Sequence, residues 1–336
     1  MIKDETIGSK VDIAAKHEFR RGDNDIATNL GHAEPEMGQE PITAARICAV
    51  VVTFFPDCEL SDRLKCIRGS VGGLLIVDNT DSVELPKALD VLKSWANTGI
   101  IRNASNLGIG RAVNDGLREA ARRGFKWAVL LDQDSAPGPR LIDALCDAFS
   151  RRWQKQIAVA TPRVRDSESG LASRPAGVEG SSGGWHLVKT AQTSGSFVNI
   201  DTFFYIGGYR EDYFIDEVDH EFCLRAGLNG YAIAQSEEIL MTHSLGKITK
   251  HRFCWATYHT NNHTAVRHYY MARNLVFLFK TYLLSETRWL LVQLFTKLKV
   301  WTKVALFENG SCAKLYMVCR GVVDGLCGRR GPIGLK

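Results

Sequence analysis

The sequence lacks the patterns that identify several common classes of protein. Its nine cysteines contain no C-x-x-C pair, which argues against a zinc site or a disulfide framework and fits a reducing cytosol. No apolar signal segment opens the chain, so we expect a cytoplasmic location. The net charge of +5 is mild and no nucleic-acid recognition motif occurs, so nucleic acid is not an expected partner.

Two nucleotide-binding loops are also missing. The first β-branched run ends in Thr53-Phe-Phe-Pro56 with no G-x-G-x-x-G after it, and the chain contains no P-loop. Gly108 and Gly110 come one strand too late for the dinucleotide motif, and valine stands at position 113. Asp78 does end the second apolar run, as a ribose-binding acid would. Without the glycine loop, however, the sequence argues against a nicotinamide dehydrogenase.

What is present is a regular alternation of strand-like apolar runs and helical stretches. With 336 residues, 45% of them hydrophobic, the chain can bury one large core. The alternation predicts an α/β fold with a doubly wound, largely parallel sheet flanked by helices. We expect strands within 47–56, 73–78, 100–101, 127–131, 157–161, 231–234 and 238–243, and helices ending near 69 and spanning 111–123, 141–152 and 268–284.

The composition divides the chain into three parts. Residues 1–44 are polar and aperiodic, so we expect a disordered or weakly ordered leader. A catalytic domain is expected at 45–275, and a helical, basic extension at 276–336. Within the domain, residues 165–185 are rich in Gly and Ser and predict a mobile loop near the site.

Four apolar residues lead directly into two carboxylates in Ala128-Val-Leu-Leu-Asp-Gln-Asp-Ser135. The apolar part fits a strand buried on both faces, and ligands bind at the carboxyl ends of such strands. Residues i and i+2 of an extended chain point to one side, so Asp132 and Asp134 can face a single hard cation. The alternative is a surface turn in which Asp134 caps the helix after Pro137.

A second acidic cluster, Asp216-Glu-Val-Asp219-His-Glu221, opens a predicted helix. Asp216 and Asp219 have the spacing of the N-cap and N3 residues of a capping box, and Glu221 and Arg225 have that of an i, i+4 ion pair. Structural roles can therefore account for every charge. The functional interpretation is that an acid held among apolar neighbours has a raised pKa and serves as a general base.

Residues 289–307 form the most apolar segment, but Lys297, Lys299 and Lys303 interrupt it, which argues against a helix that spans a membrane. Arg288 falls on the same helical arc as Lys299 and Lys303. The pattern predicts an amphipathic helix lying in the plane of a membrane surface, followed by a basic tail. The alternative is a helix that packs in the core or forms a homodimer.

Taken in order, these motifs resemble the inverting, GT-A-fold glycosyltransferases of family 2, and among them the bacterial rhamnosyltransferases of O-antigen and other surface polysaccharide biosynthesis. The similarity runs from about Ile47 to Asn274. It rests on Val-Val-Thr-Phe-Phe-Pro56, Val-Asp-Asn-Thr-Asp81, Asn-Leu-Gly-Ile-Gly-Arg-Ala-Val-Asn114, Leu-Asp-Gln-Asp134, Gly-Gly-Tyr-Arg-Glu211, Phe-Ile-Asp-Glu-Val-Asp-His-Glu-Phe-Cys-Leu-Arg225 and His243. One departure is that Tyr209-Arg210 replaces the commoner Phe-Asp, which bears on acceptor contacts.

The resemblance implies a role for each matching residue. Asp219 matches the catalytic base. Asp132, Asp134 and His243 match the residues that hold a divalent cation, Mg²⁺ or Mn²⁺. The residues implied to bind the nucleotide sugar or shape its site, with Asp78 accepting a hydrogen bond from the pyrimidine ring, are Thr53, Asp78, Asn106, Gly108, Arg111, Asn114, Asp132, Gly208 and Asp216.

The implied reaction moves L-rhamnose from dTDP-L-rhamnose to a hydroxyl group of a glycan or lipid-linked glycan, at the cytoplasmic face of the inner membrane. One base and direct displacement invert the anomeric carbon, and a cation balances the charge of the departing diphosphate. A galactofuranosyl or other family 2 donor is the alternative within this fold. Two other classes are a sugar nucleotidyltransferase, which needs a glycine-rich loop after the first strand, and a non-catalytic protein that binds nucleotide sugars.

Overall fold

The computed structural model describes residues 41–82, 84–103, 105–173, 175, 177–244, 249–253 and 256–334. Most of the predicted leader, residues 1–40, lies outside these residues. The short 3-10 turn η2 (Ala44–Arg46) leads into the first strand.

The first half of the chain builds the parallel part of a central sheet. Strand β1 (Ile47–Thr53) lies between β2 (Gly73–Asp78) and β4 (Trp127–Asp132), and β3 (Thr98–Arg102) pairs with the outer side of β2, all in parallel. All six residues of β2 are buried, as are the first five of β1 and of β4. The continuous apolar runs are therefore strands covered on both faces, as predicted.

The second half of the sheet is mixed. Strand β9 (Phe197–Asn199) runs antiparallel between β4 and β6 (Ile157–Asp166). Beyond β6 come β10 (Ala232–His243), which is parallel to it, and then the antiparallel hairpin of β8 (Trp185–Val188) and β7 (Val178–Ser182). The short strand β5 (Ser135–Pro137) pairs antiparallel with the end of β10. This pairing connects the two halves next to the carboxyl end of β4.

Three local predictions are wrong. Residues 231–243 hold one strand, β10, because register shifts let a single strand continue where the polar residues suggested two. The segment 165–185 is not a loop throughout, because part of it pairs in the β7–β8 hairpin. The predicted helix ending near residue 69 is reduced to α2 (Leu60–Leu64), which has no side-chain cap, and the 3-10 turn η3 (Lys65–Ile67).

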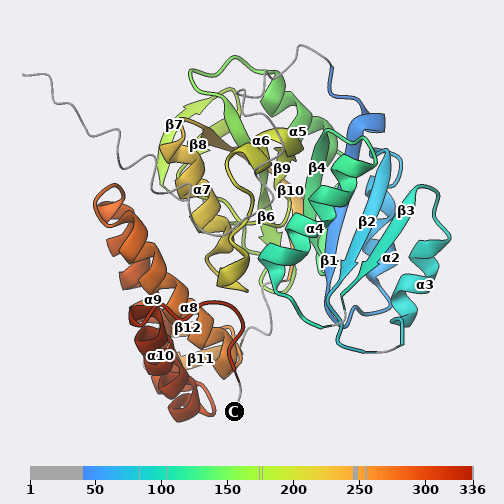
Figure 1. Cartoon of the computed structure of the whole chain (residues 1–336). Coiled ribbons are helices and arrows are strands. Elements are labelled where there is room, and N and C mark those ends of the chain that lie inside the picture. Colours follow the sequence, from blue (N-terminus) through green and yellow to red (C-terminus); the bar gives the residue numbers. More distant parts are fainter. Residues whose placement is uncertain are drawn as a thin grey trace, which may run out of the picture. The chain divides into compact units, whose positions relative to one another are not determined.

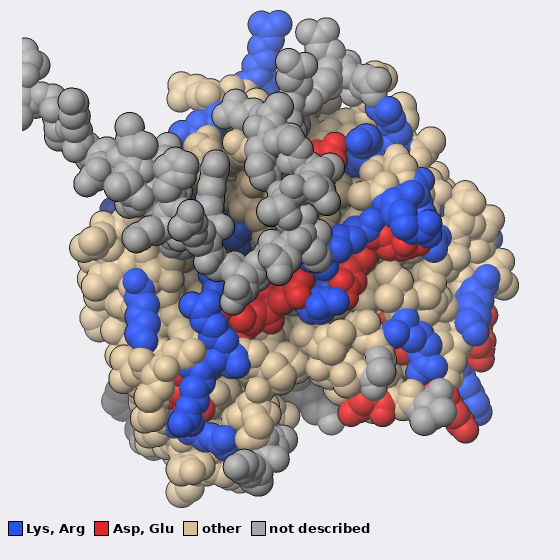
Figure 2. Space-filling view, viewed as in Figure 1, with Lys and Arg blue, Asp and Glu red and all other residues tan. Residues whose placement is uncertain are grey.

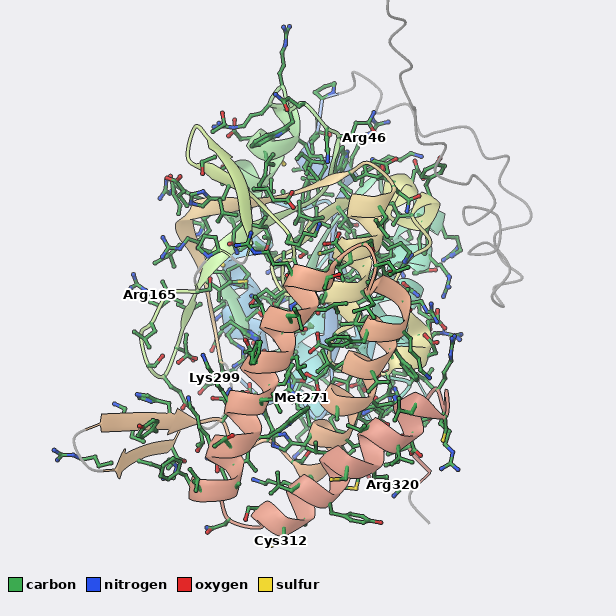
Figure 3. All side chains as sticks on the ribbon, turned by 90° about the vertical axis from the view of Figure 1, so that its left-hand side faces the viewer. Arg46, Arg165, Met271, Lys299, Cys312 and Arg320 are labelled. Carbon is green, nitrogen blue, oxygen red and sulfur yellow. The ribbon has the colours of Figure 1, made fainter. Side chains whose placement is uncertain are left out.

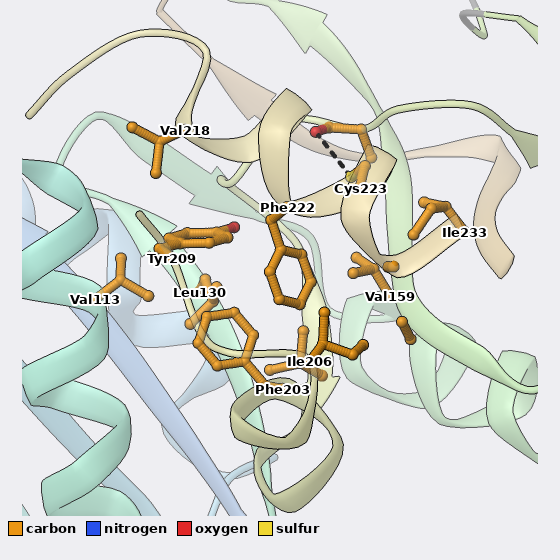
Figure 4. Packing of buried hydrophobic residues seen from close by; sticks show 14 of the residues in the cluster. Val113, Leu130, Val159, Phe203, Ile206, Tyr209, Val218, Phe222, Cys223 and Ile233 are labelled. Carbon is orange, nitrogen blue, oxygen red and sulfur yellow. Dashed lines mark hydrogen bonds between the residues drawn. The ribbon is translucent and has the colours of Figure 1, made fainter. Parts of the chain in front are cut away.

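Helices flank the sheet (Figure 1). They are α3 (Lys87–Lys93), α4 (Ile109–Arg122), α5 (Leu141–Ser150), α6 (Ile200–Tyr205) and α7 (Val218–Leu228). Figure 4 shows the core between α4, α6, α7 and the sheet, where Phe203 and Phe222 stack at 4.6 Å between ring centroids. Helix α4 lies so close to the sheet that a Cβ atom at Gly116 would stand 2.5 Å from Val50 Cγ1. This packing fixes the loops at both ends of α4.

The C-terminal part consists of the hairpin β11 (Thr249–Phe253) and β12 (Ala256–Thr260) and the helices α8 (Ala265–Tyr282), α9 (Thr287–Phe307) and α10 (Ser311–Leu326). Helix α10 packs closely on α8, since a Cβ atom at Gly321 would stand 2.3 Å from the carbonyl oxygen of Tyr269. The predicted boundary between the domain and its extension, at residue 275, falls inside helix α8, which is continuous there. That division of the chain stays a prediction. None of the described helices has the length and apolar character needed to cross a membrane.

Candidate active site

Polar side chains at the ends of three parallel strands meet at one edge of the sheet. Thr53 of β1 is level with Asp78 of β2, and Val52 of β1 is level with Asp132 of β4. Parallel strands end at a common edge, so Thr53, Asp78 and Asp132 come together there although they are far apart in the sequence. This is the edge at which the sequence predicted a ligand site.

Asp132, Asp134 and His243 form a cluster whose ligand atoms all lie within 4.8 Å of one another. His243 Nδ1 is 3.1 Å from Asp134 Oδ1, and His243 Nε2 is 4.0 Å from Asp132 Oδ2. The pairing of β5 with β10 creates the cluster, because it sets His243 opposite Ser135. Ser135 Oγ also lies 3.1 Å from His243 Nδ1 and thereby orients the ring.

The donor set of this cluster suits a divalent cation. Carboxylate oxygens bind both Mg²⁺ and Mn²⁺, and an imidazole nitrogen is a usual ligand for transition metals. Burial, with smaller contributions from Asp134 and Asp219, raises the pKa of Asp132 to about 6, although His243 lowers it. Burial alone would lower the pKa of His243, but Asp134 and Asp132 raise it above its ordinary value. The crowded negative charge is what a bound cation would relieve.

Asp78 is fully buried at the end of β2 and contacts Thr80, which lines a recess. Its Oδ1 accepts hydrogen bonds from Thr53 Oγ1 at 2.9 Å and from Thr80 Oγ1 at 2.7 Å. Its Oδ2 is buried and has no hydrogen-bond partner among the described residues, and Arg102 Nε stands 3.6 Å away. A hollow of about 350 Å³ next to Thr80 is lined also by Phe55 and Pro56. A buried oxygen that makes no hydrogen bond gains one when a ligand N–H comes within reach.

Asn106 and Gly108 shape the turn that leads into α4. The backbone N–H of Gly108 donates to Asn106 Oδ1 at 3.0 Å. Gly108 has a φ of 84°, and a Cβ atom there would stand 2.4 Å from the carbonyl oxygen of Phe214. That same oxygen accepts from the N–H of Ile109 at 2.7 Å. Only glycine fits this close approach. The contact holds the turn against residues 213–217, the acidic segment before α7.

Arg111 and Asn114 of α4 contact the turn that contains Gly208 and Glu211. Arg111 pairs with Asp115 at 2.7 Å and with Glu211 at 3.3 Å. Figure 2 shows that acidic and basic side chains lie side by side in a band across one face of the molecule. The buried Asn114 side chain donates to the carbonyl oxygen of Tyr209 and accepts from its N–H, both at 2.9 Å. Gly208 has a φ of 65° beside Asn114. These contacts hold the turn before Glu211, and contact with substrate stays a prediction.

The acidic segment enters α7 through left-handed backbone. Phe214, Asp216 and Glu217 have φ angles of 67°, 61° and 61°. Glu217 is the N-cap residue and its side chain makes no capping hydrogen bond, so the predicted capping box of Asp216 and Asp219 is wrong. Asp216 instead accepts from Arg267 Nε and Nη2 at 3.1–3.2 Å. Asp219 is left as the second residue of the helix, free of a capping role.

The predicted ion pair of Glu221 and Arg225 is confirmed. Arg225 Nη2 is 2.7 Å from Glu221 Oε2, and the two side chains are buried. Arg225 also donates to the carbonyl oxygens of Ile206 and Gly208 at 2.6 and 2.7 Å. Tyr282 of α8 donates to the remaining oxygen of Glu221 at 2.8 Å. Every polar group of the pair has a partner, so this is a structural anchor for α7.

Asp219 lies close to the cation cluster. Its Oδ1 accepts from the N–H of His220 at 2.8 Å, and its Oδ2 accepts from the N–H of Thr193 at 3.2 Å. The next residue, Ser194, accepts from the N–H of Asp132 at 3.1 Å through its hydroxyl group and contacts Ser135. Thr193 contacts Asp219, and its neighbour Ser194 contacts the end of β4, which carries Asp132.

Two residues that the sequence analysis assigned no role hold the acidic segment in place. The buried amide of Asn274 donates to the carbonyl oxygens of Tyr213, Ile215 and Asp216 at 2.8–3.0 Å. Arg273 donates to Tyr213 from the same turn of α8 at 2.8 Å. The available signal was an Arg-Asn pair between apolar residues in the middle of a helix, where buried polar groups must find partners.

Comparisons with known proteins agree with this geometry. Residues 74–210 match the family model described as Glycosyl transferase family 2. The chain is 27% identical over 249 residues to the dTDP-rhamnosyl transferase RfbF of Shigella flexneri, which covers 70% of this chain and 80% of that protein. The crystal structure of S. aureus TarS residues 1–349 superposes with a TM-score of 0.54 at 12% identity, covering 84% of this chain and 82% of that one. This last likeness shows the fold alone.

Proposed function

The chain is a glycosyltransferase of family 2 with a GT-A fold, as predicted, and we propose that it transfers L-rhamnose from dTDP-L-rhamnose to a hydroxyl group of a glycan acceptor. The observation that carries the donor is the similarity to a dTDP-rhamnosyl transferase over four fifths of that protein's length. The carboxylate cluster and the recess would serve other nucleotide sugars equally well, so a galactofuranosyl donor remains the alternative.

The recess at Asp78 is the proposed site of the thymine base. Its Oδ2 makes no hydrogen bond among the described residues and has Arg102 Nε 3.6 Å away, so it would accept one from the ring N3–H of a thymine, while Thr53 and Thr80 hold the other oxygen. A buried carboxylate oxygen that gains a donor recovers the cost of its desolvation, which favours a base that carries an N–H at that position. The exposed ring of Phe55 beside the hollow offers an apolar face to the base.

The diphosphate is proposed to lie beside Asp132, Asp134 and His243, which would together hold Mg²⁺ or Mn²⁺. When bound there, the cation would balance the charge that develops on the diphosphate as the bond to the sugar breaks. The neighbouring Ser135 and Ser194 hydroxyl groups keep the strand end and the histidine ring in place.

Asp219 is the proposed general base. It would remove the proton of the acceptor hydroxyl group while the hydroxyl oxygen bonds to the anomeric carbon and the bond from that carbon to dTDP breaks. The two backbone N–H groups that hold its oxygens, from His220 and Thr193, fix the direction of the carboxylate. Direct attack by the acceptor oxygen on the face opposite the leaving group inverts the anomeric carbon. This reaction requires one base and no nucleophile from the protein.

The outer face of α9 is the proposed contact with a membrane surface that presents a lipid-linked acceptor, at the cytoplasmic face of the inner membrane. Leu291, Val292, Phe295 and Leu298 are 43–61% exposed there, and the 21 residues of α9 include no acid. Lys299 lies on the same helix (Figure 3) and is exposed. Apolar side chains mixed with cations suit the headgroup region of an anionic bilayer.

Thermal shift and turnover measurements on purified protein test the donor. We expect dTDP-L-rhamnose to raise the Tm more in the presence of Mn²⁺ than in its absence, and release of dTDP to accompany transfer or slow hydrolysis. Full turnover of a UDP-hexose with none of dTDP-rhamnose would contradict the proposed donor. A protein that binds the donor but neither transfers nor hydrolyses it would instead be a non-catalytic binding protein.

A further inference from the structure

Lys297 differs from Arg288 and Lys299 of α9 because its ammonium group faces a buried carboxylate. Its Nζ lies 2.6 Å from Glu217 Oε1, and the two side chains are 15% and 1% exposed. Arg288 and Lys299 of the same helix are exposed. A helix that only covers a surface keeps its lysines in water, so a buried lysine indicates a specific contact.

Glu217 connects α9 to the first turn of α7 through both of its oxygens. Oε1 faces Lys297, and Oε2 is 2.7 Å from His220 Nδ1. The ring centroid of His220 in turn lies 5.4 Å from that of Trp289, which like Lys297 belongs to α9. Glu217 is the residue immediately before α7, and Asp219 is the second residue of that helix. The carboxylate proposed as the base therefore stands on a turn that α9 holds from the side.

The charges of this contact support one another. Burial alone would raise the pKa of Glu217, but Lys297 and His220 lower it below its ordinary value. Burial alone would lower the pKa of Lys297, but Glu217 raises it, and so do Asp216 and Asp219. Both partners are therefore ionised at neutral pH. Removing either one leaves the other charge buried without its partner, which is far more disruptive than losing a surface pair.

The Lys297–Glu217 pair holds the residue that follows the backbone positions held by Arg273 and Asn274. Arg273 and Asn274 hold the backbone as far as the carbonyl oxygen of Asp216. Glu217 comes next, with a φ of 61°. A non-glycine residue keeps a left-handed backbone only when its surroundings hold it there. The ion pair with Lys297 supplies that restraint at the last residue before the helix.

We propose that Lys297 is a positioning residue for glycosyl transfer: through Glu217 it fixes the left-handed entry of α7 and thereby the direction of the Asp219 carboxylate. The C-terminal helix α9 is then part of the catalytic framework as well as a surface element. The inference rests on the proposed role of Asp219. It predicts an effect on the chemical step and none on donor binding, because Lys297 touches neither the recess at Asp78 nor the cation cluster.

The test compares Lys297→Met with Lys314→Met in the full chain. Lys314 is a matched control because it forms a buried pair with Glu308 at the same 2.6 Å, at the start of α10. We expect both variants to lose stability, but only Lys297→Met to lose kcat, by about 10–100-fold, as small misplacements of a reacting group do. KM for the donor should stay unchanged, and Lys297→Arg, which keeps the charge, should retain more kcat than Lys297→Met.

A folded Lys297→Met protein with parental kcat, or one whose kcat falls no more than that of Lys314→Met, overturns the inference. Should Lys297→Met not fold, Glu217→Gln tests the same contact from its other side with the same expected loss. Should the parental protein turn over no nucleotide sugar, the proposed function fails and the catalytic part of the inference fails with it; amide hydrogen exchange of residues 217–220 then tests the structural part, that Lys297 fixes the entry of α7. Faster exchange there in Lys297→Met than in Lys314→Met supports it, and equal exchange overturns it.

Discussion

Replacing Asp219 by asparagine separates catalysis from structure at the centre of the proposed mechanism. The substitution keeps the size of the side chain and removes its charge and its ability to take up a proton. Asp219 accepts from two backbone N–H groups, those of His220 at 2.8 Å and Thr193 at 3.2 Å. It forms no side-chain cap of α7, so its structural contribution is confined to these two hydrogen bonds and the interaction with the helix dipole.

The structural cost can be worked out from these contacts. Asparagine has one carbonyl oxygen, so it keeps at most one of the two hydrogen bonds, and a bond to a charged acceptor contributes about 1.5–3 kcal/mol. The dipole interaction contributes about 0.3–1 kcal/mol more. Partial exposure of the side chain favours the lower end, so we expect Asp219→Asn to lose roughly 1–3 kcal/mol. For a chain of this size that lowers the Tm by on the order of 5 °C, and the protein stays folded.

The catalytic cost is much larger. A general base typically contributes about 10²–10⁴ in rate, so kcat should fall by at least that factor while donor affinity changes little. Asp201→Asn is the matched control, because Asp201 is also the second residue of a helix, α6, and pairs with Lys126 at the surface. It should keep parental kcat. A folded Asp219→Asn protein with more than about a tenth of parental kcat would refute the assignment of the base.

Three further outcomes follow from the cluster and from α9. Mn²⁺-dependent donor binding should weaken as the pH falls toward and through about 6, since the pKa of Asp132 is raised to about 6, the pKa of His243 is raised as well, and the cation needs an ionised carboxylate and a neutral imidazole; titration by thermal shift that shows no weakening would contradict this. Asp134→Asn should abolish the Mn²⁺-dependent shift and His243→Ala should only reduce it, because water can replace a neutral ligand; two variants that behave like the parent would make the cluster a simple strand-end turn. Phe295→Glu should reduce flotation with anionic liposomes and Leu228→Glu, which is similarly exposed at the end of α7, should not; equal flotation of both would refute membrane contact through α9.

Much of the site could be predicted because buried parallel strands leave a clear trace in a sequence. The runs before Thr53, Asp78 and Asp132 are apolar without interruption, and polar residues begin where each strand ends. The ends of parallel strands share one edge, so local patterns were enough to place these three side chains in one site. The family resemblance added His243, which no local pattern near residue 243 connects to the Asp-x-Asp segment.

What the chain by itself determined is therefore its α/β class and the strand-end acids, since strand and helix periodicity are local properties. The tertiary structure decided which charges are structural and which are available for chemistry. Asp216 was expected to cap a helix and pairs with Arg267, while Lys297, to which the sequence assigned no partner, lies largely out of solvent against Glu217. Partners like these belong to different helices and meet only after the helices pack. Their spacing in the sequence has no period, so no pattern of residues reveals them before the fold does.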